Sequence, residues 1–193
     1  MRKRALQVCC NALLLTKRPG NWLRRMGDAC ACAALRGEDV GRLFAWRDGT
    51  PPPNVWIGTT VENQEMADKR IPELLKIPAK MRFLSCEPLL EEVTLDRIGE
   101  KCRWEHMTRI AIKAEWPSLY DMKGIHWVIC GGESGARARP MDVEWARSLS
   151  SQCENAGVPF FMKQMDINGK VTRDMNLFPS DLKTREFPQC LTN

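Results

Sequence analysis

Short apolar runs, separated by longer stretches of mixed polarity, set the hydrophobic pattern of this chain. Each run holds about four residues, mostly Leu, Val, Ile, Phe and Trp, which is typical of a strand buried on both faces. Five runs are predicted to be strands: residues 12–15, 55–58, 81–84, 127–130 and 159–162.

Helical periodicity fills several of the intervals between these runs. The clearest helix covers residues 142–155, where Asp142 is a good N-cap and apolar positions recur every three or four residues. A second helix is predicted to begin at Asn63, with Pro72 opening a further turn. Residues 22–46 have a helical pattern that glycines interrupt.

Strands that alternate with helices favour βαβ units and a mostly parallel sheet. The sequence therefore predicts an α/β fold, a partial TIM-barrel-like βα repeat with about five parallel strands. Residues 1–165 would form this partial barrel, with an irregular insertion at about 95–124. Residues 166–193 are expected to be a polar tail, which has a tight turn near Asn168 and one apolar anchor at 177–179.

Composition supports a folded domain. The chain has 193 residues, of which 44% are hydrophobic and 27% charged, so a sizeable core is expected and wholesale disorder is excluded. The net charge of +5 permits a nucleic-acid or phosphate partner, although a solvated basic surface is the alternative.

Neither a membrane span nor a leader is expected. No apolar run reaches the roughly 18 residues of a transmembrane helix. The apolar stretch after the basic start is interrupted by Gln7 and Asn11, so a strand is favoured over a signal peptide. The nine cysteines are odd in number and lack zinc-finger spacing, which indicates reduced thiols, no metal site and a cytoplasmic protein.

Polar side chains follow directly after each predicted strand. In parallel βα folds these carboxyl ends meet at one side of the sheet, where functional groups collect. Three carboxylates hold equivalent positions after successive strands: Glu62, Glu87 and Glu133. Three cations from the same side are expected to neutralise them: Lys17, Arg18 and Lys163.

Such a cluster suits proton transfer, metal binding or recognition of a polar substrate. Mutual repulsion would raise the pKa of at least one carboxylate. The candidate catalytic residues are therefore Lys17, Glu62, Glu87, Glu133 and Lys163. The alternative is that each glutamate caps a helix and satisfies its free N–H groups.

A glycine-rich turn follows the fourth predicted strand. The bare backbone of Gly131 and Gly132, together with Ser134, could approach a phosphate or cofactor closely, so these three are the candidate cofactor-binding residues. The turn lacks the Lys-Ser/Thr of a nucleotide-binding loop. Cys86 could be a reactive thiol or a buried small residue, and His126 is expected at the opposite end of its strand.

Several blocks of sequence together resemble an uncharacterised bacteriophage-associated family, found in phages and prophage-bearing bacteria, whose full-length members carry an N-terminal three-cysteine motif. The blocks cover about residues 13–164 in a fixed order. They are residues 15–19, 54–58, 61–64, 82–90, 127–129, 131–135, 139–141, 157–161 and 163–164.

The resemblance implies a radical-SAM-like barrel, in which a cysteine trio binds an iron–sulfur cluster that cleaves S-adenosylmethionine. Some relatives in that superfamily repair DNA lesions. The required three-cysteine spacing does not occur in this sequence. The chain thus resembles the C-terminal portion of the family, as a truncated gene product would, and no cofactor is expected on this chain alone.

Three hypotheses follow, and whether the chain is an enzyme stays open among them. The first is the substrate-side portion of a radical-SAM-like phage protein that acts on nucleic acid, with a missing N-terminal segment or partner protein. The second is a non-catalytic module that binds nucleic acid or a protein. The third is an inactive prophage fragment, whose open half-barrel leaves a sheet edge exposed.

Overall fold

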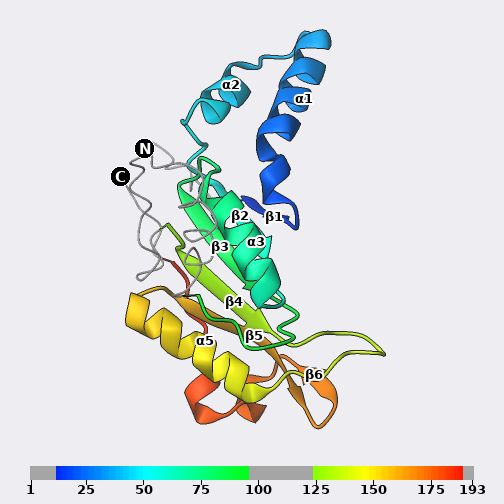
Figure 1. Ribbon diagram of the computed structural model, residues 1–193, viewed down its shortest axis with the longest axis vertical. Helices are drawn as coiled ribbons and strands as arrows, with labels where there is room; N and C mark the ends of the chain where they lie inside the picture. Colours follow the sequence, from blue (N-terminus) through cyan, green and yellow to red (C-terminus); the bar gives the residue numbers. More distant parts are fainter. Residues whose placement is uncertain (1–11, 96–123, 189–193) are drawn as a thin grey trace, which may run out of the picture.

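The computed structural model describes residues 12–95 and 124–188, which form a mixed α/β fold around one curled, half-barrel sheet (Figure 1). Six strands follow one another across the sheet in chain order. The first five are parallel, and the last is antiparallel to its neighbour. They are β1 Ala12–Thr16, β2 Val55–Thr60, β3 Met81–Cys86, β4 Trp127–Gly131, β5 Phe160–Ile167 and β6 Lys170–Thr172.

All five predicted strands are confirmed, and each extends beyond the apolar run that predicted it. Several of the added residues are polar or small and are still buried, among them Thr59 and Thr60 of β2 and Ser85 of β3. Strands in a parallel sheet are covered on both faces, so their ladders continue where the hydrophobic signal ends.

Four α-helices of the described chain connect or cover the strands: α1 Trp22–Leu35, α2 Gly41–Arg47, α3 Gln64–Leu75 and α5 Val143–Ala156. Short 3-10 turns occur at η1 Pro19–Asn21, η3 Met175–Leu177 and η4 Ser180–Leu182. None of the described helices combines the length and apolar character needed to cross a membrane.

The helix starts agree with the predictions from the sequence. The Asn63 side chain accepts a hydrogen bond from the Met66 N–H, and Asp142 accepts one from Glu144 N–H, both at 2.9 Å. The separate turn predicted at Pro72 is wrong, because this proline lies inside α3. Ile71 and Leu74, on either side of the proline, are fully buried, and this packing keeps the helix continuous through it.

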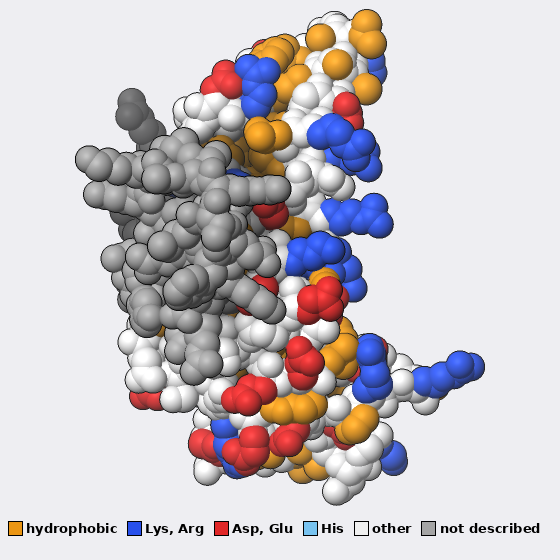
Figure 2. All heavy atoms as spheres, in the orientation of Figure 1, with side chains coloured by type: hydrophobic (Ala, Val, Ile, Leu, Met, Phe, Trp, Pro, Cys, Tyr) orange, Lys and Arg blue, Asp and Glu red, His pale blue; other side chains and the backbone are white. Residues whose placement is uncertain are grey.

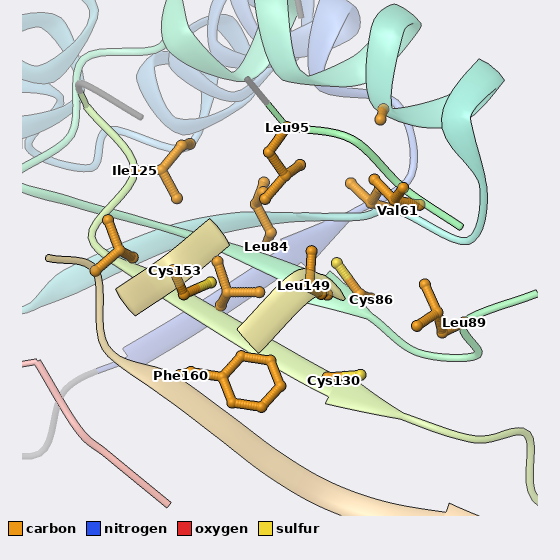
Figure 3. Packing of buried hydrophobic residues seen from close by; sticks show 14 of the residues in the cluster. Val61, Leu84, Cys86, Leu89, Leu95, Ile125, Cys130, Leu149, Cys153 and Phe160 are labelled. Carbon is orange, nitrogen blue, oxygen red and sulfur yellow. The ribbon is translucent and has the colours of Figure 1, made fainter. Parts of the chain in front are cut away.

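The main core lies between the sheet and helices α3 and α5 (Figure 3). Leu84 and Cys86 of β3, Leu149 and Cys153 of α5 and Phe160 of β5 are all buried there. The opposite face of the sheet carries a smaller aromatic cluster. Its members are Trp56, Met81, Phe83 and Trp127.

The C-terminal tail is more firmly anchored than the sequence predicts. The tight turn is confirmed: Asn168 and Gly169 have positive φ and join β5 to β6. Phe178 and Leu182 are buried, whereas Leu177, part of the expected anchor, is exposed. Beyond Leu182, residues 184–186 form an antiparallel bridge with β5, which no hydrophobic periodicity marks.

Candidate functional site

The carboxyl ends of the five parallel strands form a rim along one side of the sheet (Figure 1). We call it the carboxyl rim and define it by the residues that follow these strands, with Lys163 of β5. The predicted charged residues all lie on it. They are not one acidic cluster, because the described chain arranges them as three separate ion-pair groups.

The first group surrounds Glu62, after β2. One carboxylate oxygen lies 3.1 Å from Lys17 Nζ, after β1, and the other lies 2.6 Å from Arg70 Nη1 of α3. Arg70 also donates to the Thr60 carbonyl at 2.7 Å. The Glu62 and Arg70 side chains are each only 13% exposed, whereas Lys17 is 65% exposed. Arg70 is therefore the partner that fixes the carboxylate.

Burial and charge act in opposite directions on Glu62. Burial by itself would raise its pKa, but the hydrogen bond from Lys17 and the charges of Arg70 and Lys17 lower it further than burial raises it. The pKa of Glu62 is thus below its ordinary value, and the group is an ionised hydrogen-bond acceptor at neutral pH.

The second group spans β4. Glu87, after β3, lies 2.8 Å from Lys163 Nζ of β5. The ion pair of Glu87 and Lys163 lies close to Gly131. A Cβ atom added to Gly131 would lie 3.5 Å from Glu87 Cδ and 3.1 Å from Gln164 Cγ. Gly131 therefore leaves room for the neighbouring side chains, a role that differs from the predicted contact with a cofactor.

The third group closes the loop after β4. Glu133 accepts hydrogen bonds from the backbone N–H of Arg139 at 2.9 Å and from its guanidinium at 2.7 and 2.8 Å. These hydrogen bonds lower the pKa of Glu133 to about 2. The expected mutual repulsion is absent at Glu62 and Glu133, since both pKa values fall.

The alternative role as helix caps is wrong for two of the three glutamates. The side chain of Asn63 caps α3, and that of Asp142 caps α5. Glu62 and Glu133 instead form the ion pairs described above.

Part of the glycine-rich turn is held by internal hydrogen bonds, so its backbone groups are already used within the fold. Gly132 donates its N–H to the Gln164 carbonyl at 3.1 Å, and its own carbonyl accepts from Gln164 Nε2 at 2.8 Å. Ser134 differs because it is exposed and lines an open pocket of about 710 Å³ beside the β5–β6 hairpin. Of the three predicted cofactor-binding residues, Ser134 faces this cavity.

Two hydroxyl residues lie in register just below the rim. Thr60 of β2 pairs with Ser85 of β3, and both are buried. The Thr60 Oγ1 atom has no hydrogen-bond partner among the described residues. A buried hydroxyl of this kind is available to a bound polar group. Both belong to the polar strand ends that the sequence predicts on this side of the sheet, although neither is among the candidate catalytic residues.

The described cysteines do not fit an iron–sulfur cluster. Cys86 and Cys130 lie among apolar side chains (Figure 3), and burial raises the pKa of both thiols; that of Cys153 rises to about 12. Cys86 is thus a buried small residue and not a reactive thiol. Within residues 12–95 and 124–188, no three potential ligands gather as a metal site would require.

The histidine of the described residues, His126, does not join the carboxyl rim. His126 precedes β4, as expected, and its Nδ1 accepts a hydrogen bond from the Arg82 N–H at 3.1 Å. Burial, and then the charge of Arg82, lower the pKa of His126, which keeps the imidazole neutral. His106 and the cysteines Cys9, Cys10, Cys102 and Cys190 lie outside the described residues.

Comparison with known proteins supplies a family but no activity. No curated protein and no solved structure matches the chain. One family model, described as protein of unknown function (DUF5131), matches residues 6–184, nearly the whole chain. This chain therefore belongs to the DUF5131 family of proteins of unknown function.

Proposed function

We propose that this protein binds a nucleic-acid strand across the carboxyl rim. The observation that carries the proposal is a set of cations on this side of the sheet that have no carboxylate partner within the described chain. They occur after β1, after β4 and on the β5–β6 hairpin: Arg18, Arg137, Lys170 and Arg173. Figure 2 shows Lys and Arg side chains spaced along the right-hand side of the molecule.

Cations spaced in this way suit a polyanion. A strand of nucleic acid offers phosphates at regular intervals, and each neutralised phosphate releases a counter-ion and adds affinity. The net charge of +5 favours the same partner. The basic residues would hold the backbone without reading its sequence.

The ion-paired carboxylates would contact the bases. Arg70 holds Glu62 in a fixed position and Lys163 does the same for Glu87, so both oxygen pairs are oriented acceptors. Carboxylates accept hydrogen bonds from the amino groups of bases, and the nearby Thr60 hydroxyl can donate or accept.

The finer hypothesis is that the half-barrel is the substrate-side portion of a radical-SAM-like phage enzyme. Five parallel strands in chain order, with polar groups at their carboxyl ends, support a barrel origin. Because the described cysteines form no cluster site, cleavage of S-adenosylmethionine is not assigned to them. Robust cleavage by this chain after anaerobic reconstitution with iron and sulfide would overturn that view.

Fluorescence anisotropy with a labelled 15-nucleotide single strand tests the binding proposal. We expect affinity to fall steeply as salt rises from 50 to 200 mM, with a slope of about −0.7 for each contacted phosphate. Replacement of Arg18 and Arg137 by Gln should weaken binding roughly tenfold.

A control variant removes the same charge from the opposite side. Arg42 lies on α2 and Lys80 directly before β3, both away from the carboxyl rim. Arg42→Gln with Lys80→Gln should leave the affinity unchanged. Absence of binding at 50 mM salt, or equal loss in both double variants, would contradict the proposal.

A further inference from the structure

The open pocket beside the glycine-rich turn has a lining suited to an anion. The loop after β4 contributes Ser134, Gly135 and Ala138, and β5 contributes Gln164. The β5–β6 hairpin and the residue after it supply the remainder of the lining: Gly169, Lys170, Val171, Thr172 and Arg173. Among these described lining residues there are two cations and no carboxylate.

The acidic side chain of the loop after β4, that of Glu133, is already neutralised. Arg139 binds Glu133 through three hydrogen bonds, which also lower the pKa of that carboxylate to about 2. Glu133 is therefore paired at neutral pH and does not line the pocket. The positive charge of Lys170 and Arg173 is left available to an incoming anion.

Gln164 lines the pocket and orients both the loop after β4 and the Arg173 side chain. It is 2% exposed, donates through Nε2 to the Gly132 carbonyl at 2.8 Å and accepts from Arg173 Nε at 3.3 Å. One buried amide thus holds both the loop and the guanidinium. No other described residue accepts from the Arg173 guanidinium, which has five donors in a fixed fork and can therefore bind a second acceptor.

Hydroxyl groups complete the donor set. Thr172 Oγ1 accepts a hydrogen bond from the Asp174 N–H at 3.1 Å, which leaves its own hydrogen available to donate. Ser134, from the loop after β4, is exposed and also lines the pocket. The residues that line the pocket thus carry hydroxyl, ammonium and guanidinium donors, with Lys170 and Thr172 on one face of the hairpin and Arg173 on the other. This combination of donors binds phosphate oxygens.

We propose that this pocket is a phosphate-binding subsite, formed by Ser134, Lys170, Thr172 and Arg173. It deepens the proposed function, because a phosphate held here would anchor one end of a strand that crosses the carboxyl rim. The phosphate could be an internal phosphodiester of the strand or a terminal phosphate group.

The experiment uses the full chain and two kinds of probe. The first is inorganic phosphate, followed by amide chemical shifts in NMR spectra. We expect the Ser134, Gly135 and Thr172 amides to shift with saturation, and the shifts to vanish in Lys170→Gln with Arg173→Gln. Shifts confined to other residues, or unchanged in the variant, would overturn the subsite even if the strand binds elsewhere on the rim.

The second kind of probe is a single-stranded 15-mer, with either a 5′-phosphate or a 5′-hydroxyl. If the pocket holds an internal phosphodiester, the double variant should bind both strands roughly tenfold more weakly, with a salt slope smaller by about 0.7 to 1.4. If it holds a terminal phosphate, only the phosphorylated strand should lose affinity.

The Arg42→Gln, Lys80→Gln variant is the matched control and should behave as the wild type with every probe. Equal melting temperatures of the variants would exclude unfolding as the cause of any loss. Failure of the wild type to bind either 15-mer, with the phosphate shifts intact, would contradict the proposed function and leave the subsite standing. Strand affinity and salt slope unchanged in the pocket variant would overturn the anchoring role.

Discussion

The two edges of the sheet differ in how the described chain covers them. At the β5 edge, β6 pairs with Met165–Ile167, and the segment 184–186 pairs with the first residues of the strand, 160–162. The Met162 N–H donates to the Thr184 carbonyl, and the Glu186 N–H donates to the Phe160 carbonyl, both at 2.9 Å. Both ends of β5 therefore have a neighbouring segment on this edge.

The β1 edge lacks such a cover within residues 12–95 and 124–188. Among these residues, β1 pairs with β2 alone. Leu13, Leu14 and Leu15 are 47%, 45% and 53% exposed, although alternate side chains point to opposite faces of the sheet. Both faces of β1 are thus half open, and its run of leucines was the signal that predicted a buried strand.

The comparison shows that the residues that form a strand and the residues that cover its outer edge are specified by different parts of the sequence. An apolar run of β-prone residues is enough to place β1 in the sheet. Burial of its outer side requires another segment, which the C-terminal tail provides at β5. Open apolar edges are sites of association, so the difference can be tested directly.

The largest change in the free energy of unfolding is expected when the tail that covers the β5 edge loses a buried side chain. Leu182 is 1% exposed and anchors the tail before it reaches β5, so Leu182→Ala should lower the free energy of unfolding by about 3 kcal/mol. Leu15→Ala removes the same atoms from the open edge and should cost less than about 1 kcal/mol. Urea unfolding of both variants measures the difference, and equal losses would contradict the assignment of the two edges.

Removal of the Glu62 charge should have the next largest effect. Glu62→Gln leaves Arg70 with a weakened partner in a mostly buried position and should destabilise the protein by about 2 kcal/mol. The control is Glu38→Gln, whose pair with Arg36 is exposed, and it should leave the urea midpoint unchanged. A change of similar size in both variants would show that Arg70 does not fix the carboxylate.

The same site predicts a pH dependence. The pKa of Glu62 is lowered in the folded protein, whereas it is about 4.3 in an unfolded chain. Its contribution to stability is therefore present above pH 4.3 and is lost as the pH falls below that value towards the folded pKa. The difference in unfolding free energy between wild type and Glu62→Gln should shrink between pH 6 and pH 3.5; a constant difference would argue against this linkage.

A smaller effect on the free energy of unfolding is expected in the β5–β6 hairpin. Gly169 has a φ of +77°, which an L side chain adopts with strain, so Gly169→Ala should destabilise by about 1 kcal/mol. Gly27 lies inside α1 with open space around it, and Gly27→Ala should stabilise by about 0.5 kcal/mol. Thermal melts of the two variants should move in opposite directions.

The smallest effect on stability is expected at the open edge. Leu14→Lys places a charge on a half-exposed position of β1 and should change the unfolding free energy by less than about 0.5 kcal/mol. It should, however, reduce concentration-dependent association and dye binding to apolar surface. Sedimentation velocity tests this, and unchanged association would place the apolar contact elsewhere.

Local signals accounted for the strands and for the positions of the charged residues. Alternation of apolar runs with helical patterns predicted five parallel strands, and all five are present. Parallel strands must deliver their carboxyl ends to one side, which is why Lys17, Glu62, Glu87 and Lys163 could be placed on one rim.

The pairing of those charges was predictable only in part: Lys17 and Lys163 neutralise glutamates as expected, whereas the arginine partners were not expected. Arg70 is eight residues from Glu62, and it reaches the carboxylate only because α3 packs back on β2. The arginine that engages Glu133 depends on the path of a glycine-rich loop, which has no periodic signal. The expected single acidic cluster therefore became three ion-pair groups.

The sequence by itself determined the strands, the helix caps, the tight turn at Asn168 and the side of the sheet that carries polar groups. These features depend on contacts among near neighbours in the chain and on the geometry that all parallel sheets share. Tertiary structure alone decided that Arg70 would hold Glu62 and that Gln164 would join the loop to the hairpin. It also decided that the tail would cover β5, while no other described residue covers the outer side of β1. Those outcomes depend on side chains and backbone groups that are distant in sequence, and their meeting depends on how the elements pack.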